Sequence, residues 1–89
     1  MRVEKSYRGI SERLARHYLS NLGGEIEGGD PEGDGDVVAD DWRASVSSET
    51  VEVGPSVELT EITVVFEGDA AALDDLVEDF SRKAMRAGG

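Results

Sequence analysis

The chain has 89 residues, no cysteine, and twenty acidic against nine basic residues, for a formal net charge of -11 at pH 7. This length fits one domain over residues 1–89, and the lack of cysteine excludes disulfide bonds and thiolate metal sites. No apolar run approaches the roughly 20 residues of a membrane span, and the first residues lack the apolar core of a signal peptide, so we expect a cytoplasmic protein without membrane contact.

The charge is unevenly distributed along the chain. Residues 1–22 carry a net +3 and residues 23–81 a net -17, and three basic residues after position 81 restore +3. Two interpretations stay open: the basic ends contact the acidic middle in the fold or in a dimer, or residues 1–22 form an anion-facing patch. The dense acidic surface, with only two lysines, also predicts a halophilic protein, because salt screens the repulsion between like charges.

The first part of the chain predicts a strand and then a helix. Residues 2–10 alternate enough to form a strand with Val3, Lys5 and Tyr7 on one side, and Gly9 marks a turn. Ser11 is a suitable N-cap for the helix that follows, which ends at Gly23-Gly24. The apolar stripe of this helix consists of Leu14, Ala15, Tyr18, Leu19 and Leu22.

The middle of the chain predicts short strands and a long loop. Residues 24–27 are a short strand candidate, and residues 28–36 consist of turn formers and acids typical of an exposed loop. We expect the next strands over residues 37–47 and 50–53, joined by a two-residue turn at Ser48-Glu49. These strands are short and closely linked, as antiparallel neighbours are.

The last third carries the strongest pattern. Residues 56–67 alternate as a strand, but the apolar residues change parity near Thr60, which predicts a bulge there. Gly68 ends this strand and Asp69 is a suitable N-cap for a second helix. The buried stripe of that helix is predicted to be Leu73, Leu76, Val77, Phe80 and Ala84.

These elements predict an α+β fold of order β-α-β-β-β-β-α. The expected architecture is an antiparallel sheet of four to five strands with two helices on one face, toward which Trp42, Ile62, Val64 and Phe66 point. This order resembles the TATA-binding-protein-like fold. With the segments ISERLARHYLSNLGG and VGPSVELTEITVVFEGD and the acidic composition, the chain resembles the small domain found at the C-terminus of some MoaD-related proteins and alone in salt-loving archaea.

The resemblance implies an association with sulfur-carrier or molybdenum-cofactor proteins and assigns no functional residues. The nucleic-acid binding of other members of the fold is not expected here, because a duplex repels such an acidic surface.

Gly88-Gly89 is a candidate functional tail. Ubiquitin-like sulfur carriers and modifiers are activated at a terminal Gly-Gly. Only glycine is small enough to pass through the narrow channel of the activating enzyme. In those proteins a strand precedes the tail, whereas a helix is predicted before Gly88, where glycine is also an ordinary helix cap.

The acidic loop is a candidate divalent-cation site. Asp30, Glu32, Asp34 and Asp41 fall at positions 1, 3, 5 and 12 of an EF-hand spacing, with Gly35 at position 6. Position 12 should be a glutamate and the flanks should be helices, so a solvated loop is the simpler interpretation.

An anion-facing patch is the third candidate. Arg13, Arg16 and His17 share the polar face of the first predicted helix, and Arg43 lies on a strand. A small organic anion could be held between the sheet and the helices, with Arg13, Arg16 or Arg43 at the mouth of the site, provided that a pocket of about 300 Å³ or more exists there.

No residue pattern indicates catalysis. His17 has no second histidine or paired carboxylate at helical spacing, and no nucleophile or phosphate-binding motif occurs. We therefore expect no catalytic residues and no cofactor. The main hypothesis is a non-enzymatic binding or accessory module that contacts a protein partner or a second copy of itself, with the Gly-Gly carrier and the organic-anion binder as alternatives.

Overall fold

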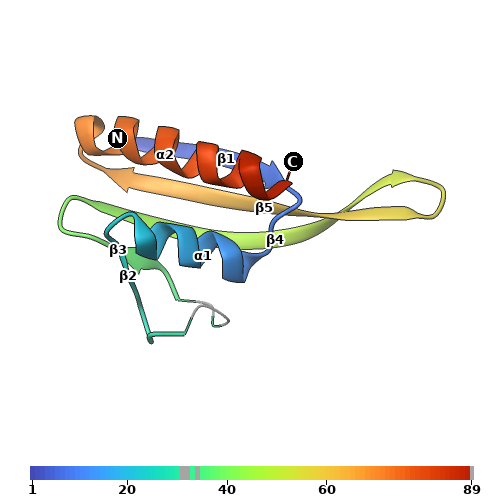
Figure 1. Cartoon of the computed structure of the whole chain (residues 1–89), viewed down its shortest axis with the longest axis horizontal. Helices are drawn as coiled ribbons and strands as arrows, with labels where there is room; N and C mark the ends of the chain where they lie inside the picture. The colour runs from blue at the N-terminus through green and yellow to red at the C-terminus, as the bar shows by residue number, and fades with distance from the viewer. Residues whose placement is uncertain (31–32, 34, 89) are drawn as a thin grey trace.

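Five antiparallel strands and two helices make up the part of the chain that the structure describes, residues 1–30, 33 and 35–88 of a computed structural model (Figure 1). The elements are β1 (Arg2–Arg8), α1 (Glu12–Asn21), β2 (Glu25–Ile26), β3 (Val37–Val38), β4 (Trp42–Gly54), β5 (Val57–Gly68) and α2 (Ala70–Gly88). The strand order in the sheet is β1-β5-β4-β3-β2. The predicted fold class and element order are confirmed.

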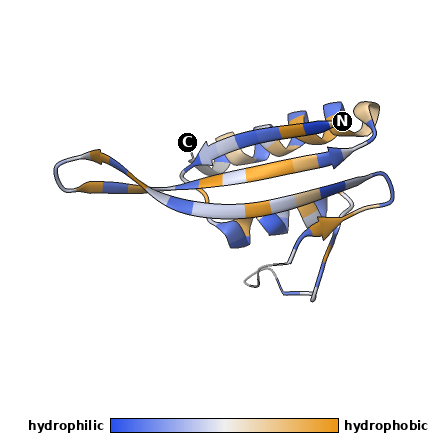
Figure 2. Ribbon diagram, turned by 180° about the vertical axis from the view of Figure 1, so that it is seen from behind, coloured by the Kyte–Doolittle hydropathy of each residue, from blue (hydrophilic) through white to orange (hydrophobic). Residues whose placement is uncertain are grey.

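Both helices cover the same face of the sheet, α2 over β1 and β5 and α1 over β4 (Figure 1). The view from behind shows the strands in front of the helices, so the other face of the sheet is open (Figure 2). Alternation along the strands explains the division: Ile62, Val64 and Phe66 are buried under the helices, whereas Glu67 is exposed. Trp42 is buried as well, as predicted.

The caps of both helices are as the sequence predicts. The Ser11 hydroxyl accepts the N–H of Leu14 at 3.1 Å, and a carboxylate oxygen of Asp69 accepts the N–H of Ala72 at 3.2 Å. These bonds satisfy N–H groups that have no partner inside a helix. The helices then place their apolar stripes on one continuous core with the sheet.

The core contains the buried residues of both predicted stripes and of β3, β4 and β5, and the partly buried Val3 and Tyr7 of β1 pack against it. Phe80 is at its centre, with edge-on ring contacts to Tyr7, Tyr18 and Phe66 at centroid distances of 5.0, 6.3 and 5.7 Å. The Tyr7 hydroxyl is 3.0 Å from that of Ser81, which satisfies its polar end. Val77 of the predicted stripe is only partly buried. The fully or nearly buried apolar residues are Ile10, Ala15, Leu19, Val37, Trp42, Ala44, Val46, Ile62, Val64, Phe66, Leu73, Leu76, Phe80 and Ala84.

The predicted strand boundaries between residues 37 and 57 are wrong. The strand expected over residues 37–47 is broken after Val38 by a turn in which the N–H of Ala39 bonds the carbonyl of Trp42 at 2.8 Å. The turn expected at Ser48-Glu49 is absent, because β4 continues through both residues to Gly54 and pairs with β5 all along. The turn lies at residues 55–56, where proline has no N–H to give to a ladder.

The bulge predicted near Thr60 is also wrong. Thr60 pairs in regular register with Thr50, and the irregularity lies in β4 between Glu52 and Gly54. The apolar residues change from odd to even positions because the helices cover only part of the strand. Ile62 points to the helices, whereas Leu59 and Val57 belong to a stretch that no described helix covers. A change of buried face therefore resembles a register slip in the sequence.

Candidate functional site

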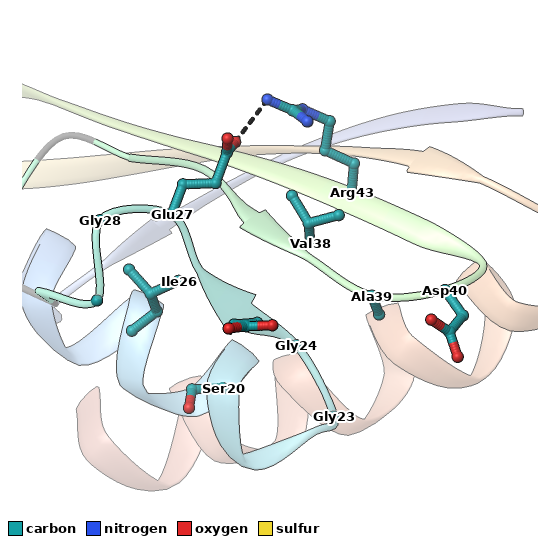
Figure 3. Close-up of a pocket in the computed structure, with 12 residues that line it drawn as sticks. Ser20, Gly23, Gly24, Ile26, Glu27, Gly28, Val38, Ala39, Asp40 and Arg43 are labelled. Atoms are coloured by element: carbon teal, nitrogen blue, oxygen red, sulfur yellow. Dashed lines mark hydrogen bonds and ion pairs between the residues drawn. The ribbon is translucent and has the colours of Figure 1, made fainter.

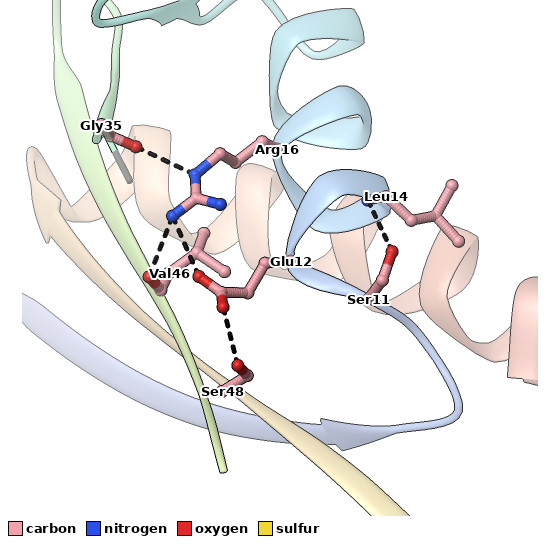
Figure 4. A network of polar contacts seen from close by, with 7 residues as sticks. All are labelled: Ser11, Glu12, Leu14, Arg16, Gly35, Val46 and Ser48. Atoms are coloured by element: carbon pink, nitrogen blue, oxygen red, sulfur yellow. Dashed lines mark hydrogen bonds and ion pairs between the residues drawn. The ribbon is translucent and has the colours of Figure 1, made fainter. Parts of the chain in front are cut away.

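Arg16 of α1 is buried and links the helix, the sheet and the acidic loop by hydrogen bonds (Figure 4). Only 1% of this residue is exposed. Its Nε donates to the carbonyl of Gly35 at 3.0 Å, and its Nη2 donates to a carboxylate oxygen of Glu12 at 3.1 Å and to the carbonyl of Val46 at 3.3 Å. The planar guanidinium suits this role, because it presents several donors in a fixed geometry.

Glu12 extends this network to the sheet. Its second carboxylate oxygen accepts the Ser48 hydroxyl at 2.7 Å (Figure 4). The ion pair between Arg16 and Glu12 therefore fixes the start of α1 over β4. The Nε and Nη2 of Arg16 bond to groups inside the fold and the residue is buried, so it has a structural role and does not face solvent as an anion site.

Arg43 closes the acidic loop from the open face of the sheet. Its Nη2 lies 2.6 Å from a carboxylate oxygen of Glu27, and its Nε donates to Asp36 at 3.0 Å. The N–H of Glu27 also bonds the carbonyl of Asp36 at 2.8 Å, so the two ends of the loop are held together. The hydrogen bond to Asp36 and the charge of Glu27 raise the pKa of Arg43.

An open hollow of about 910 Å³ lies beside Arg43, between the end of α1 and strands β2 and β3 (Figure 3). Its wall consists mainly of glycine backbone and of the carboxylates of Glu25, Glu27 and Asp40. The guanidinium of Arg43 is already paired with Glu27 there. The lining is therefore electronegative and unsuited to the organic anion predicted from the sequence.

The predicted anion-facing residues do not meet in the structure. Arg16 is buried, and Arg13 and His17 are exposed on α1. Arg43 projects from the opposite face of the sheet, since its neighbour Ala44 is buried under the helices. The sheet therefore separates Arg43 from the helical members of the patch.

The basic N-terminal segment contacts the acidic middle instead. The Nε of Arg2 lies 3.6 Å from Glu67, and the Nε of Arg8 donates to Glu61 at 3.1 Å. Both pairs join β1 to β5 across register partners. Contact within the fold thus accounts for the charge segregation at these two positions.

The predicted cation ligands are divided by the fold or lie outside the described residues. Glu32 and Asp34 are outside them. Asp30 belongs to the loop that precedes β3, whereas Asp41 follows β3, where its carbonyl accepts the N–H of Asp69 at 3.0 Å. Among residues 1–30, 33 and 35–88, no three carboxylate, histidine or cysteine side chains are grouped to hold a metal ion.

Gly88 is the last residue of α2, and Gly89 lies outside the described residues. The helix that precedes Gly88 is the one predicted from the sequence. Because Gly88 is itself helical, the described residues before it do not form the extended segment that precedes the tail of ubiquitin-like carriers.

The most exposed apolar side chains of the sheet lie on a feature that the sequence analysis missed. We call residues 49–60 the hairpin arm: here β4 and β5 continue beyond the last β1–β5 pair, Arg8–Glu61 (Figures 1 and 2). Val53, Val57 and Leu59 are 46%, 53% and 41% exposed. The change of apolar parity in the sequence was the signal for it.

Within the described residues, none of the helices is long and apolar enough to cross a membrane. A family model described as Archaeal MoaD-like protein matches residues 3–89, and no curated protein shows significant similarity to the chain.

Proposed function

The chain belongs to the archaeal MoaD-like protein family, and from this premise we propose that it is a non-enzymatic binding module that contacts a protein partner. The family resemblance adds the context of sulfur-carrier or molybdenum-cofactor proteins, in which such a module serves as an accessory. A module of this kind requires an interaction surface and does not require an active site.

The observation that carries the proposal is the hairpin arm. Its two strands project from the sheet, and no other described strand or helix lies beside them. A two-stranded hairpin is only marginally stable in water by itself, and exposed apolar residues gain free energy when they are covered. A protein partner that covers the arm would stabilise the hairpin and bury its exposed apolar side chains.

The polar networks support the same conclusion. The donors of Arg16 are bonded to Glu12 and to two backbone carbonyls, and Arg43 is bonded to Glu27 and Asp36. These groups hold the loop and α1 in place. Arg16 is buried, and the guanidinium of Arg43 is already paired with two carboxylates, which is why we propose a binding protein and not an enzyme.

Affinity purification of the tagged full chain at the salt concentration of its source cells tests the proposal. We expect a co-eluting protein at a defined stoichiometry, identified by mass spectrometry and lost when the arm is shortened to a tight turn. A control chain shortened in the acidic loop should keep the partner. Absence of any stoichiometric partner, or retention after arm shortening, counts against the proposal.

The Gly-Gly carrier is the second candidate, because the family is MoaD-like and positions 88–89 are both glycine. We rank it lower because α2 reaches Gly88 directly. Mass spectrometry of the chain isolated from its source cells distinguishes the two: a thiocarboxylate or isopeptide-linked form that disappears on deletion of Gly89 supports the carrier and removes the reason for this ranking.

A further inference from the structure

We propose that the outer edge of β4 in the hairpin arm accepts a basic, amphipathic strand of the partner protein by strand addition. This inference rests on the proposed function and names the site and the chemistry of its partner. It follows from three properties of residues 48–60: a free backbone edge, an apolar face and an excess of carboxylates.

In the described part of the chain, no strand pairs with the outer edge of β4 beyond Ala44. β3 pairs with β4 only at Arg43 and Ala44. The carbonyls of Trp42 and Val46 point away from β5, since they accept the N–H of Ala39 and the Nη2 of Arg16. Alternation along the strand therefore points the N–H and C=O groups of residues 48, 50 and 52 the same way.

Arg16 and Glu12 mark where this free edge begins. Arg16 takes the outward carbonyl of Val46, and Glu12 takes the side chain of Ser48. Beyond Ser48, no described strand or helix lies beside the edge of β4 that faces away from β5. Edge strands of this kind are templates for another strand, and natural proteins usually block them with lysine or proline.

The side chains of the arm specify an alternating partner. Val51 and Leu59 are directly opposite each other on the open face. The other face carries the Thr50–Thr60 and Glu52–Glu58 pairs. A strand added beside β4 therefore places every second side chain next to Val51, where it should be apolar, and the intervening ones next to Glu52, where they should be basic.

Charge complementarity favours a basic partner over a second copy of this chain. The arm contains Glu49, Glu52 and Glu58 and no Lys, Arg or His, and the whole chain has a net charge of -11. The Glu52–Glu58 pair is unfavourable without a counter-charge. The chain's own basic groups are largely committed: Arg2, Arg8, Arg16, Arg43 and Arg82 are all paired with its own carboxylates.

The size of the apolar patch supports the same choice. Three residues exposed by about half are far from the roughly 1,200 Å² that a stable specific interface buries. Packing two arms face to face would bury little apolar area and bring like charges together. Strand addition instead gains backbone hydrogen bonds, which need no large apolar surface.

A peptide titration with two matched proline variants tests the inference. The probe is a nine-residue peptide that alternates lysine and valine, and its controls are a peptide of the same composition with the lysines grouped and one with glutamate in place of lysine. Binding is followed by the amide signals of the full chain at a KCl concentration at which circular dichroism shows every variant folded.

Thr50→Pro and Thr60→Pro are the decisive variants. Both residues are at outward-pointing positions and pair with each other, so each proline removes an edge N–H and leaves the β4–β5 ladder intact. Thr50→Pro blocks the β4 edge, whereas Thr60→Pro blocks only the β5 edge. The two variants should have similar stability, which makes each the control of the other.

We expect the alternating peptide to bind about tenfold more tightly than the grouped one, which corresponds to 1.4 kcal/mol. Shifts should be concentrated in residues 48–54, and binding should be lost in Thr50→Pro and kept in Thr60→Pro. Equal binding of all peptides, or binding that survives Thr50→Pro, overturns the inference. A dimer that forms without peptide and dissociates on Val51→Ser also overturns it, in favour of a second copy.

The outcome is separable from that of the proposed function. If a partner is captured by the wild-type chain and equally by Thr50→Pro, the binding module stands and the strand-addition site falls. If no partner is captured in any form, the proposed function itself falls.

Discussion

The Nη2 of Arg16 lies 3.3 Å from the carbonyl oxygen of Val46, so a side chain of α1 occupies the sheet edge where a further strand would donate. The same guanidinium bonds Glu12 and Gly35. A single buried cation thus caps one outward carbonyl of β4, holds α1 over the sheet and attaches the loop.

Replacing Arg16 with Met should destabilise the chain by roughly 2–4 kcal/mol, because the buried carbonyl of Val46 and the part-buried carbonyl of Gly35 lose their donor and Glu12 loses its cation. Urea unfolding in 2 M KCl measures the change. Arg43→Met is the matched control: this side chain is half exposed, its ion pairs are screened, and its loss should have a small effect. Equal losses in the two variants would contradict the structural role of Arg16.

Gly68→Ala should be more destabilising than Gly23→Ala. Both glycines have positive φ, at +149° and +106°. A Cβ at Gly68 would meet the backbone of Asp41 and the Cα of Trp42, the latter at 2.7 Å, whereas a Cβ at Gly23 meets no atom within 4 Å. The crowding should add about 1–3 kcal/mol, measured as the difference between the two free energies of unfolding. No difference would mean that the β3–β4 turn moves aside without cost.

Alkaline pH should destabilise the fold through Tyr7. Burial raises the pKa of its hydroxyl above the usual 10.0, against a smaller opposing effect of the bond to Ser81. The folded state therefore holds its proton to higher pH than the unfolded state, and the stability present below pH 10 is lost as pH rises through the folded pKa.

Tyr7→Phe and Ser81→Ala isolate this effect, since both remove the same hydrogen bond and only Ser81→Ala keeps the titrating ring. Stability measured from pH 8 to 11 should fall less steeply in Tyr7→Phe than in Ser81→Ala. Parallel curves would assign the alkaline loss to other groups.

Salt should stabilise the chain. A net charge of -11 and facing glutamates at positions 52 and 58 produce repulsion that KCl screens. We expect the melting temperature to rise between 0.1 M and 2 M KCl, by about 4–8 °C for each kcal/mol of repulsion relieved. Replacing both glutamates with glutamine should raise the value in 0.1 M KCl and reduce the dependence on salt. A melting temperature that stays constant would remove the high-salt interpretation.

The sequence predicted the fold class well because its strongest signals are local. Ser11 and Asp69 cap their helices by contacts within three residues, and the buried stripe of α2 repeats at helical spacing. The strand boundaries failed where the local signal was ambiguous. Ser48 and Glu49 are ordinary turn residues, and only their pairing with β5 keeps them extended.

The predicted site failed for a different reason. On a helical wheel Arg16 belongs to the polar face of α1, and only the return of the loop to Gly35 and the length of β4 bury it. The i, i+4 spacing of Glu12 and Arg16 was the available signal. Likewise, the exposed valines of the arm alternate like those of a core strand, and only the sheet topology shows that no layer covers them.

The sheet order has a consequence for biosynthesis. Of the described elements β1 is made before the others, yet the strand that it pairs with is β5, and the partners Arg2 and Glu67 are 65 positions apart in the sequence. The β4–β5 hairpin can close locally, whereas β1 has to wait for nearly the whole chain. Four of the seven residues of β1 are charged, which suits that interval because charge keeps a lone strand from pairing with neighbouring nascent chains.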